Sequence, residues 1–144
     1  MFNRALRKFR RTGLRRDERG QAQIETAFTI FTILVIIFAA IEMWSAVYTY
    51  VVLSDAANEG LRYAIVHSSD GSDTNTAAIV TQYASYSLHD TSGITVTVAT
   101  TPAASWTPPN IVTVTVSYPY VPYLGAFMHS PPTMNAYAQG RFVN

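Results

Sequence analysis

An uncharged, apolar run from Thr26 to Ile41 most constrains what this chain can fold into. With its flanks it makes an apolar segment from Ala22 to Met43, which as a helix at 1.5 Å per residue would measure about 33 Å. That length crosses the hydrocarbon core of a membrane, where a helix satisfies its own backbone hydrogen bonds. The sequence therefore predicts a membrane-spanning helix over residues 22–43, with the lipid bilayer as its surroundings.

The charges of the chain are divided sharply at Gly20. Residues 1–20 carry eight basic and two acidic side chains, whereas residues 21–144 carry two basic and seven acidic ones. Lys and Arg beside a span hold that end in the cytoplasm, so we expect a cytoplasmic N-terminus and a translocated C-terminal part. A basic block can also bind nucleic acid, but no basic or aromatic surface elsewhere in the sequence supports that partner.

A removed secretory signal peptide is the main alternative to a retained span. Its apolar region would contain about 7–15 residues and would end at a small-x-small cleavage site. Here the apolar segment is longer, and it is followed by Trp44, Tyr48 and Tyr50, which are typical of a membrane–water interface. These features favour a retained span, with Glu42 at its outer interface.

One acidic residue, Glu25, lies between the basic block and the uncharged run, five residues after Gly20. A carboxylate near the end of a span is costly in lipid, and its role is functional unless it reaches water. Cleavage after Gly20 would make Gln21 the new N-terminus, and its ammonium group could pair with Glu25 of a neighbouring subunit. Without cleavage, Glu25 would be hydrated at the interface, near Arg19.

The residues around this site carry a family resemblance. The hexapeptide Gly20-Gln-Ala-Gln-Ile-Glu25 resembles the processing site of class III type IV prepilins. The longer segment from Gly20 to Ala64 resembles the TadE-like minor pilins (pseudopilins) of tight-adherence (Flp) pilus systems. Its second half, LSDAANEGLRYA over residues 53–64, is similar to the family signature Ala-Ala-x-Glu-Gly-Ala-Arg-x-Ala.

The resemblance implies a function and a set of partners. It implies cleavage between Gly20 and Gln21 by a prepilin peptidase, and assembly through Glu25 with other pilin or pseudopilin subunits on an inner-membrane assembly platform. It implies a single-pass protein of the bacterial inner membrane with an extracytoplasmic C-terminal head, which enters a cell-surface pilus after processing and supports adhesion. It implies no cofactor.

The signature residues also have a physical interpretation. Asp55, Glu59 and Arg62 lie at i, i+4 and i+7, on one stripe of a helix, and Glu59 is spaced to pair with Arg62. An exposed pair of this kind contributes little to stability. Gly60 inside a helix costs about 1 kcal/mol relative to Ala, so another element must approach it closely or the helix must bend.

Three threonines recur at every third residue of the predicted span: Thr26, Thr29 and Thr32. Small hydroxyl residues let membrane helices approach and hydrogen-bond to one another. The same hydroxyls can instead bond to carbonyls four residues earlier in their own helix. The sequence leaves both interpretations open.

The expected domain organisation is a basic cytoplasmic leader over 1–20, a long helix over 21–67 and an extracytoplasmic head over 68–144. In the head, residues 76–88 predict a short helix with Ile79, Tyr83, Tyr86 and Leu88 as its apolar side. Residues 94–98, 111–117 and 134–143 alternate between apolar and polar residues, as strands do. The expected fold is thus α+β and pilin-like: a long N-terminal membrane-spanning helix continues into a small head with a short helix and a three-stranded antiparallel sheet.

The segment Thr100–Asn110 joins the first two predicted strands and has Trp106 among prolines. It is too long for a tight turn and is a candidate functional loop. Trp106 could be a contact anchor for another subunit or a target surface. It could equally fold back to cap the core of the head.

We expect a structural subunit and not an enzyme. The three histidines, at positions 67, 89 and 129, form no metal-ligand pair, and the sequence has no nucleophile elbow, phosphate loop or paired-carboxylate motif. No catalytic residue, metal or cofactor is therefore expected. The chain also has no cysteine, so disulfides cannot stabilise the head. The alternative function is an uncleaved single-pass membrane sensor or binding module, which would keep the basic leader.

Overall fold

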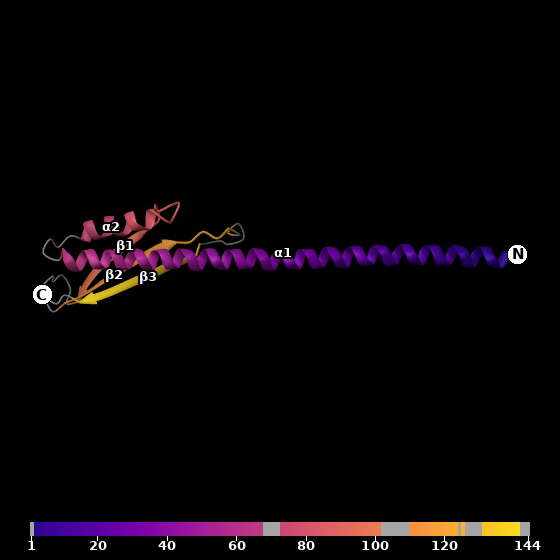
Figure 1. The fold of residues 1–144 in the computed structure, drawn as a ribbon, viewed down its shortest axis with the longest axis horizontal. Coiled ribbons are helices and arrows are strands. Elements are labelled where there is room, and N and C mark those ends of the chain that lie inside the picture. The colour runs from indigo at the N-terminus through magenta and orange to yellow at the C-terminus, as the bar shows by residue number, and fades with distance from the viewer. Residues whose placement is uncertain (1, 68–72, 102–109, 124, 126–130, 142–144) are drawn as a thin grey trace. The chain divides into compact units, whose positions relative to one another are not determined.

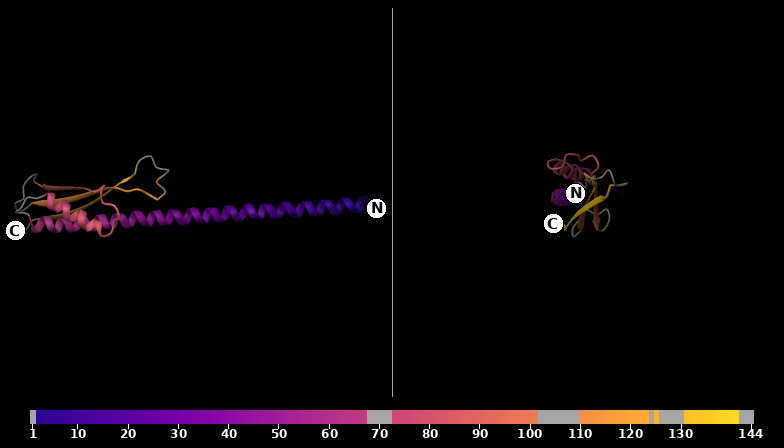
Figure 2. Two further views of the ribbon diagram at one scale, coloured as in Figure 1. Left: turned by 90° about the horizontal axis from the view of Figure 1, so that it is seen from above. Right: turned by 90° about the vertical axis from the view of Figure 1, so that its right-hand side faces the viewer.

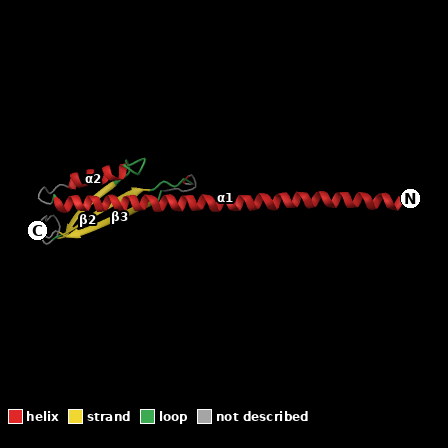
Figure 3. Ribbon diagram, in the orientation of Figure 1, coloured by secondary structure: helices red, strands yellow, loops and turns green. Residues whose placement is uncertain are grey.

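A computed structural model describes residues 2–67, 73–101, 110–123, 125 and 131–141; for residues 2–19 and 73 it describes the backbone only. Helices α1 (Phe2–Val66) and α2 (Asp73–Ser85) precede the strands β1 (Thr95–Thr101), β2 (Ile111–Pro119) and β3 (Thr133–Arg141) (Figures 1 and 3). The chain divides into two compact units, residues 1–41 and 42–144, and α1 contributes to both. The boundary lies inside the long helix expected over 21–67.

The second unit has the α+β architecture that the sequence predicted. Its three strands form an antiparallel sheet in the order β1-β2-β3, in which Val114 of the central strand lies opposite Val98 on one side and Ala138 on the other. The observed strands differ from the predicted ones by a few residues at their ends. The largest difference is in β1, which continues to Thr101 because it pairs with β2 from Ser117 to Ile111.

The core lies between one face of this sheet and the two helices. Alternate residues of β2 are completely buried, as the period of a strand with one covered face requires. The residues of α1 beyond position 41 and those of α2 lie on that face of the sheet, as the end-on view of Figure 2 shows. The buried core consists of Leu53, Ala56, Ala57, Leu61, Ala64, Val80, Ala84, Val112, Val114, Val116, Ala136 and Ala138.

Small residues let these elements approach one another closely. A methyl group added at Gly60 of α1 would collide with the Val80 side chain of α2, so the two helices are in close contact at this glycine. A methyl group at Gly140 of β3 would lie 2.7 Å from the Cδ1 atom of Ile65. The close neighbour predicted for Gly60 is therefore present, and it is a side chain of α2.

The apolar side predicted for the short helix is wrong for its two tyrosines, whereas Leu88 packs against the core. The buried residues of α2 are Thr76, Val80 and Ala84, spaced by four positions, whereas Tyr86 lies beyond the end of the helix and is 75% exposed. Close packing against Gly60 leaves no room for an aromatic ring, so the smaller side chains face the core. Threonine and alanine give a weak apolar signal in a sequence, and the tyrosines therefore dominated the predicted pattern.

The predicted linker Thr100–Asn110 lies mostly outside the described residues. Residues 102–109, which include Trp106, are outside the description. Both interpretations of Trp106 therefore stay predictions.

Replacing Gly60 with Ala should destabilise the second unit. Overpacking of a buried contact costs about 1–3 kcal/mol, and the Val80 side chain that the added methyl group would meet is completely buried. Hydrogen exchange of the β2 amides in the full chain should therefore be faster in Gly60→Ala, and the added change Val80→Ala should relieve the collision.

The matched control is Gly20→Ala, because a methyl group there meets nothing within 4 Å. This variant should leave exchange in β2 unchanged. Equal exchange rates in Gly60→Ala and the unmodified chain would show that the two helices are not in close contact at this position.

Candidate functional site

The first candidate site is the exposed apolar part of α1. Every side chain from Gly20 to Ile41 is exposed. Within the described part of the chain, α1 is the one helix that is long and apolar enough to cross a membrane. Exposing apolar surface to water costs about 25 cal/mol per Å², so this segment requires lipid or other protein chains around it.

Gly20 is helical, and within the described part of the chain no packing contact explains a glycine there. A methyl group built on it meets nothing within 4 Å, in contrast to the positions of Gly60 and Gly140. Glycine weakens a helix by about 1 kcal/mol relative to alanine. Within the described residues, Gly20 therefore lowers the stability of the helix without allowing another element to pack more closely.

Gln21 and Glu25 contact each other across one turn of α1. The Nε2 atom of Gln21 donates a hydrogen bond of 3.3 Å to Oε1 of Glu25. This partner is neutral, and none of the described side chains places a cation within ion-pair distance of the carboxylate. Glu25 therefore presents an acceptor on the exposed surface of the helix, about 6 Å along the axis from Gln21.

The threonine hydroxyls bond within their own helix. Thr26 donates to the carbonyl oxygen of Ala22 at 2.8 Å, and Thr29 and Thr32 each donate at 2.9 Å to the carbonyls of Glu25 and Phe28. Of the two interpretations that the sequence left open, the structure thus shows the intrahelical one.

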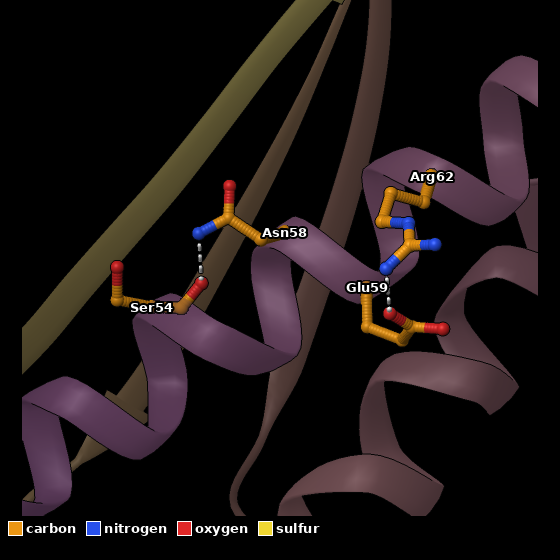
Figure 4. Close-up of polar contacts among 4 residues, drawn as sticks. All are labelled: Ser54, Asn58, Glu59 and Arg62. Atoms are coloured by element: carbon orange, nitrogen blue, oxygen red, sulfur yellow. Dashed lines mark hydrogen bonds and ion pairs between the residues drawn. The ribbon is translucent and has the colours of Figure 1, made fainter.

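The polar residues of the family-like signature lie on the solvent side of α1. Glu59 and Arg62 form an ion pair of 3.7 Å in which the side chains are 43% and 81% exposed, and Asn58 donates to the carbonyl of Ser54 at 2.9 Å (Figure 4). Asp55 is exposed as well. Such a pair contributes little to stability. In the structure the packing role of the signature is carried by its small residues, which face the core.

A second site, which the sequence did not predict, is centred on Glu42. Its carboxylate accepts a hydrogen bond of 3.0 Å from the hydroxyl of Tyr120. The backbone N–H of Tyr123 donates to both of its oxygens, at 3.0 and 3.2 Å. Glu42 thereby holds the segment after β2, about 80 positions later in the chain, against α1. We call this arrangement the Glu42 clamp.

The sequence contained one signal for the clamp. An acidic residue at the end of an apolar segment needs hydrogen-bond donors, because a buried or half-buried carboxylate without them is costly. Glu42 is half-buried. The segment from Tyr118 to Tyr123 contains three tyrosine hydroxyls, but sequence alone does not show which donor reaches the carboxylate.

Tyr120 is a donor over the whole physiological pH range. Burial raises the pKa of Tyr120; a hydrogen bond with Ser45 acts in the opposite direction, and the Glu42 carboxylate adds to the increase. An ordinary tyrosine is protonated below its titration near pH 10, and the raised pKa of Tyr120 moves its titration further from physiological pH. The hydroxyl therefore has a proton to donate to Glu42 at physiological pH.

Replacing Glu42 with Ala should release the segment that it holds. Hydrogen bonds to a charged group contribute about 1.5–3 kcal/mol each, so the amide of Tyr123 should exchange about tenfold faster or more in the variant. Glu59→Ala is the control, because it removes an exposed acid from the same helix. If the Tyr123 amide exchanges at the same rate in Glu42→Ala and the unmodified chain, the clamp does not hold this segment.

Comparison with known proteins matches part of the chain to a family. Residues 20–62 match the model of the family described as TadE-like protein. The family resemblance found in the sequence is thus confirmed over a segment that contains Gly20, Gln21, Glu25 and the signature residues from Asp55 to Arg62. No curated protein and no solved structure is significantly similar to the chain.

Proposed function

We propose that the chain is a minor pilin, or pseudopilin, of a tight-adherence (Flp) pilus: a structural subunit and not an enzyme, which supports pilus assembly and adhesion. The main support is the exposed apolar helix that begins with Gly20, Gln21 and Glu25, inside the segment that matches the TadE-like family. A pilus subunit needs such an apolar helix, because it lies first in a membrane and later among other subunits.

In the membrane form, residues 22–43 cross the bacterial inner membrane once. The basic leader holds the N-terminus in the cytoplasm by the positive-inside rule, so that most of the unit 42–144 is extracytoplasmic. Eight of the ten Lys and Arg residues of the chain lie before Gly20, which makes this the strongest topological signal that the sequence contains.

Processing takes place between Gly20 and Gln21, through a prepilin peptidase. A protease cleft binds an extended backbone, so the helix must open locally at the cleaved bond. Gly20 lowers the cost of opening by about 1 kcal/mol relative to alanine, and no packing contact within 4 Å of its position is lost. The glycine thus has a role in processing where it has none in packing.

Assembly then depends on Glu25. Cleavage creates an ammonium group on Gln21, and this group on one subunit pairs with the Glu25 carboxylate of the next. In the low-dielectric interior of a filament an unpaired carboxylate would be strongly unfavourable. The 3.3 Å bond from the Gln21 amide is long and neutral, so an ammonium can replace it at little cost.

The helix surface beside Glu25 offers a place for a neighbouring subunit. Ala22, Gln23, Thr26, Ala27 and Ile30 line a shallow hollow on α1. The Thr26 hydroxyl is bonded within its own helix, so the contact of an adjacent subunit with the three apolar residues of this hollow would rest on close packing.

Replacing Glu25 with Ala should impair assembly without removing the protein from the membrane. The apolar span is unchanged in this variant, so membrane fractions should contain normal amounts of it. Sheared pili should contain about tenfold less of it than of the unmodified chain, because the ammonium loses a charged partner in an apolar interior.

Glu59→Ala is the matched control, since it removes an exposed acid that lies outside the span. It should enter pili normally. Normal amounts of Glu25→Ala in sheared pili would contradict the role assigned to Glu25.

A further inference from the structure

One end of the unit 42–144 exposes a group of large apolar side chains. On α1 these residues lie at the end of the predicted span or directly after it, and Trp44 is 70% exposed and stacks on Tyr48 at a ring-centroid distance of 5.8 Å. The segment after β2 adds Val121 and Tyr123, which are 72% and 79% exposed. We call this set the outer-end patch; its members are Met43, Trp44, Tyr48, Val121 and Tyr123.

The Glu42 clamp brings the two parts of the patch, on α1 and after β2, close to each other. The backbone nitrogen of Tyr123 lies 3.0 Å from the Glu42 carboxylate, and Glu42 immediately precedes Met43. Because one turn of helix rises about 5.4 Å, Val121 and Tyr123 lie within a few turns of the residues that end the predicted span. Both groups of the patch therefore lie close to Glu42, at the start of the unit 42–144.

The segment is also stiffened in this position. Pro119 and Pro122 flank Tyr120 and Val121 and lock their own φ angles, and the N–H of Gly125 donates to the carbonyl of Pro122 at 2.9 Å. Little conformational freedom is left to lose when such a segment meets a surface.

The polar groups near the outer-end patch favour contact with lipid headgroups over contact with hydrocarbon. The hydroxyl of Tyr48 donates to the carbonyl of Ser87 at 3.5 Å, and that of Tyr118 donates to the carbonyl of Asp90 at 3.2 Å. These bonds place the segment with the exposed residues His89 and Asp90 at this end of the unit. The two arginines that follow residue 20 in the sequence, Arg62 and Arg141, lie at the ends of α1 and β3 that are remote from Glu42.

We propose that the outer-end patch is seated in the outer headgroup layer of the membrane, so that the extracytoplasmic unit rests on the bilayer that anchors it. The inference rests on the membrane span of the proposed function. Tryptophan and tyrosine rings settle at this depth, and the segment held by Glu42 adds a second, non-helical group of apolar side chains to the ring pair on α1. Because no Lys or Arg lies at this end, the seating needs no anionic lipid and takes place on a zwitterionic surface.

The absence of cysteine in the chain permits a direct test with single labels. The full chain is reconstituted at low density in phosphatidylcholine vesicles, with a nitroxide on one cysteine at a time, and accessibility to oxygen and to a neutral, water-soluble nickel complex is measured. Three exposed valines are replaced: Val121 in the patch, Val66 at the far end of α1 and Val35 in the span, which are 72%, 75% and 50% exposed.

The label at Val35→Cys should favour oxygen strongly and that at Val66→Cys should favour nickel. The label at Val121→Cys should show nickel accessibility at least about threefold lower than that at Val66→Cys, with no loss of oxygen accessibility, because the interface excludes polar reagents and admits oxygen. Adding Glu42→Ala to Val121→Cys should raise nickel accessibility towards the Val66→Cys value.

Each other outcome overturns a defined part of the inference. Equal nickel accessibility at Val121→Cys and Val66→Cys, with Val35→Cys in lipid, overturns the seating and leaves the span intact. Nickel accessibility at Val35→Cys equal to that at Val66→Cys overturns the span, and with it the proposed function. Low accessibility to both reagents at Val121→Cys means that protein covers the patch, which overturns a lipid partner. No effect of Glu42→Ala overturns the part assigned to the clamp.

Discussion

The close approach of α1 to α2 and to the sheet is the constraint on which the rest of the structure depends. Without cysteine, the unit 42–144 has no covalent cross-link, and its core contains mainly valine and alanine. Small side chains bury little area each, so stability requires dense packing. Gly60 against Val80, and Gly140 against Ile65, are the places where this density leaves no room for one more methyl group.

The two parts of α1 have different surroundings and different residues. Up to Ile41 the helix displays large apolar side chains that none of the described residues cover. Beyond it, alanine and glycine turn towards a core, while charged residues such as Glu59 and Arg62 turn to solvent. One continuous helix can therefore enter a membrane or a filament through its first part and hold a folded unit through its second. Glu42 lies where the change takes place, and its hydrogen bonds make an acid tolerable there.

The sequence predicted those features that depend on local periodicity. The long helix, the three strands and the close neighbour of Gly60 follow from apolar runs, from alternation and from the cost of a glycine in a helix. The buried side of α2 was not predictable in this way, because Thr76, Val80 and Ala84 are selected by the space that α1 leaves and not by hydrophobicity. The partners of Glu42 were missed for a related reason: the pairing joins residues about 80 positions apart, and only the folded unit brings Tyr120 and Tyr123 to the carboxylate.

The central claim is that the chain is a processed pilus subunit and not an intact membrane receptor. The most direct test is N-terminal sequencing of the protein extracted from membranes of cells that contain a prepilin peptidase and the pilus machinery. The account predicts a mature chain that begins with Gln21-Ala22-Gln23-Ile24-Glu25 and lacks all of residues 1–20. A chain in these membranes that still begins with Met1-Phe2-Asn3 would contradict it and would favour an uncleaved sensor or binding module.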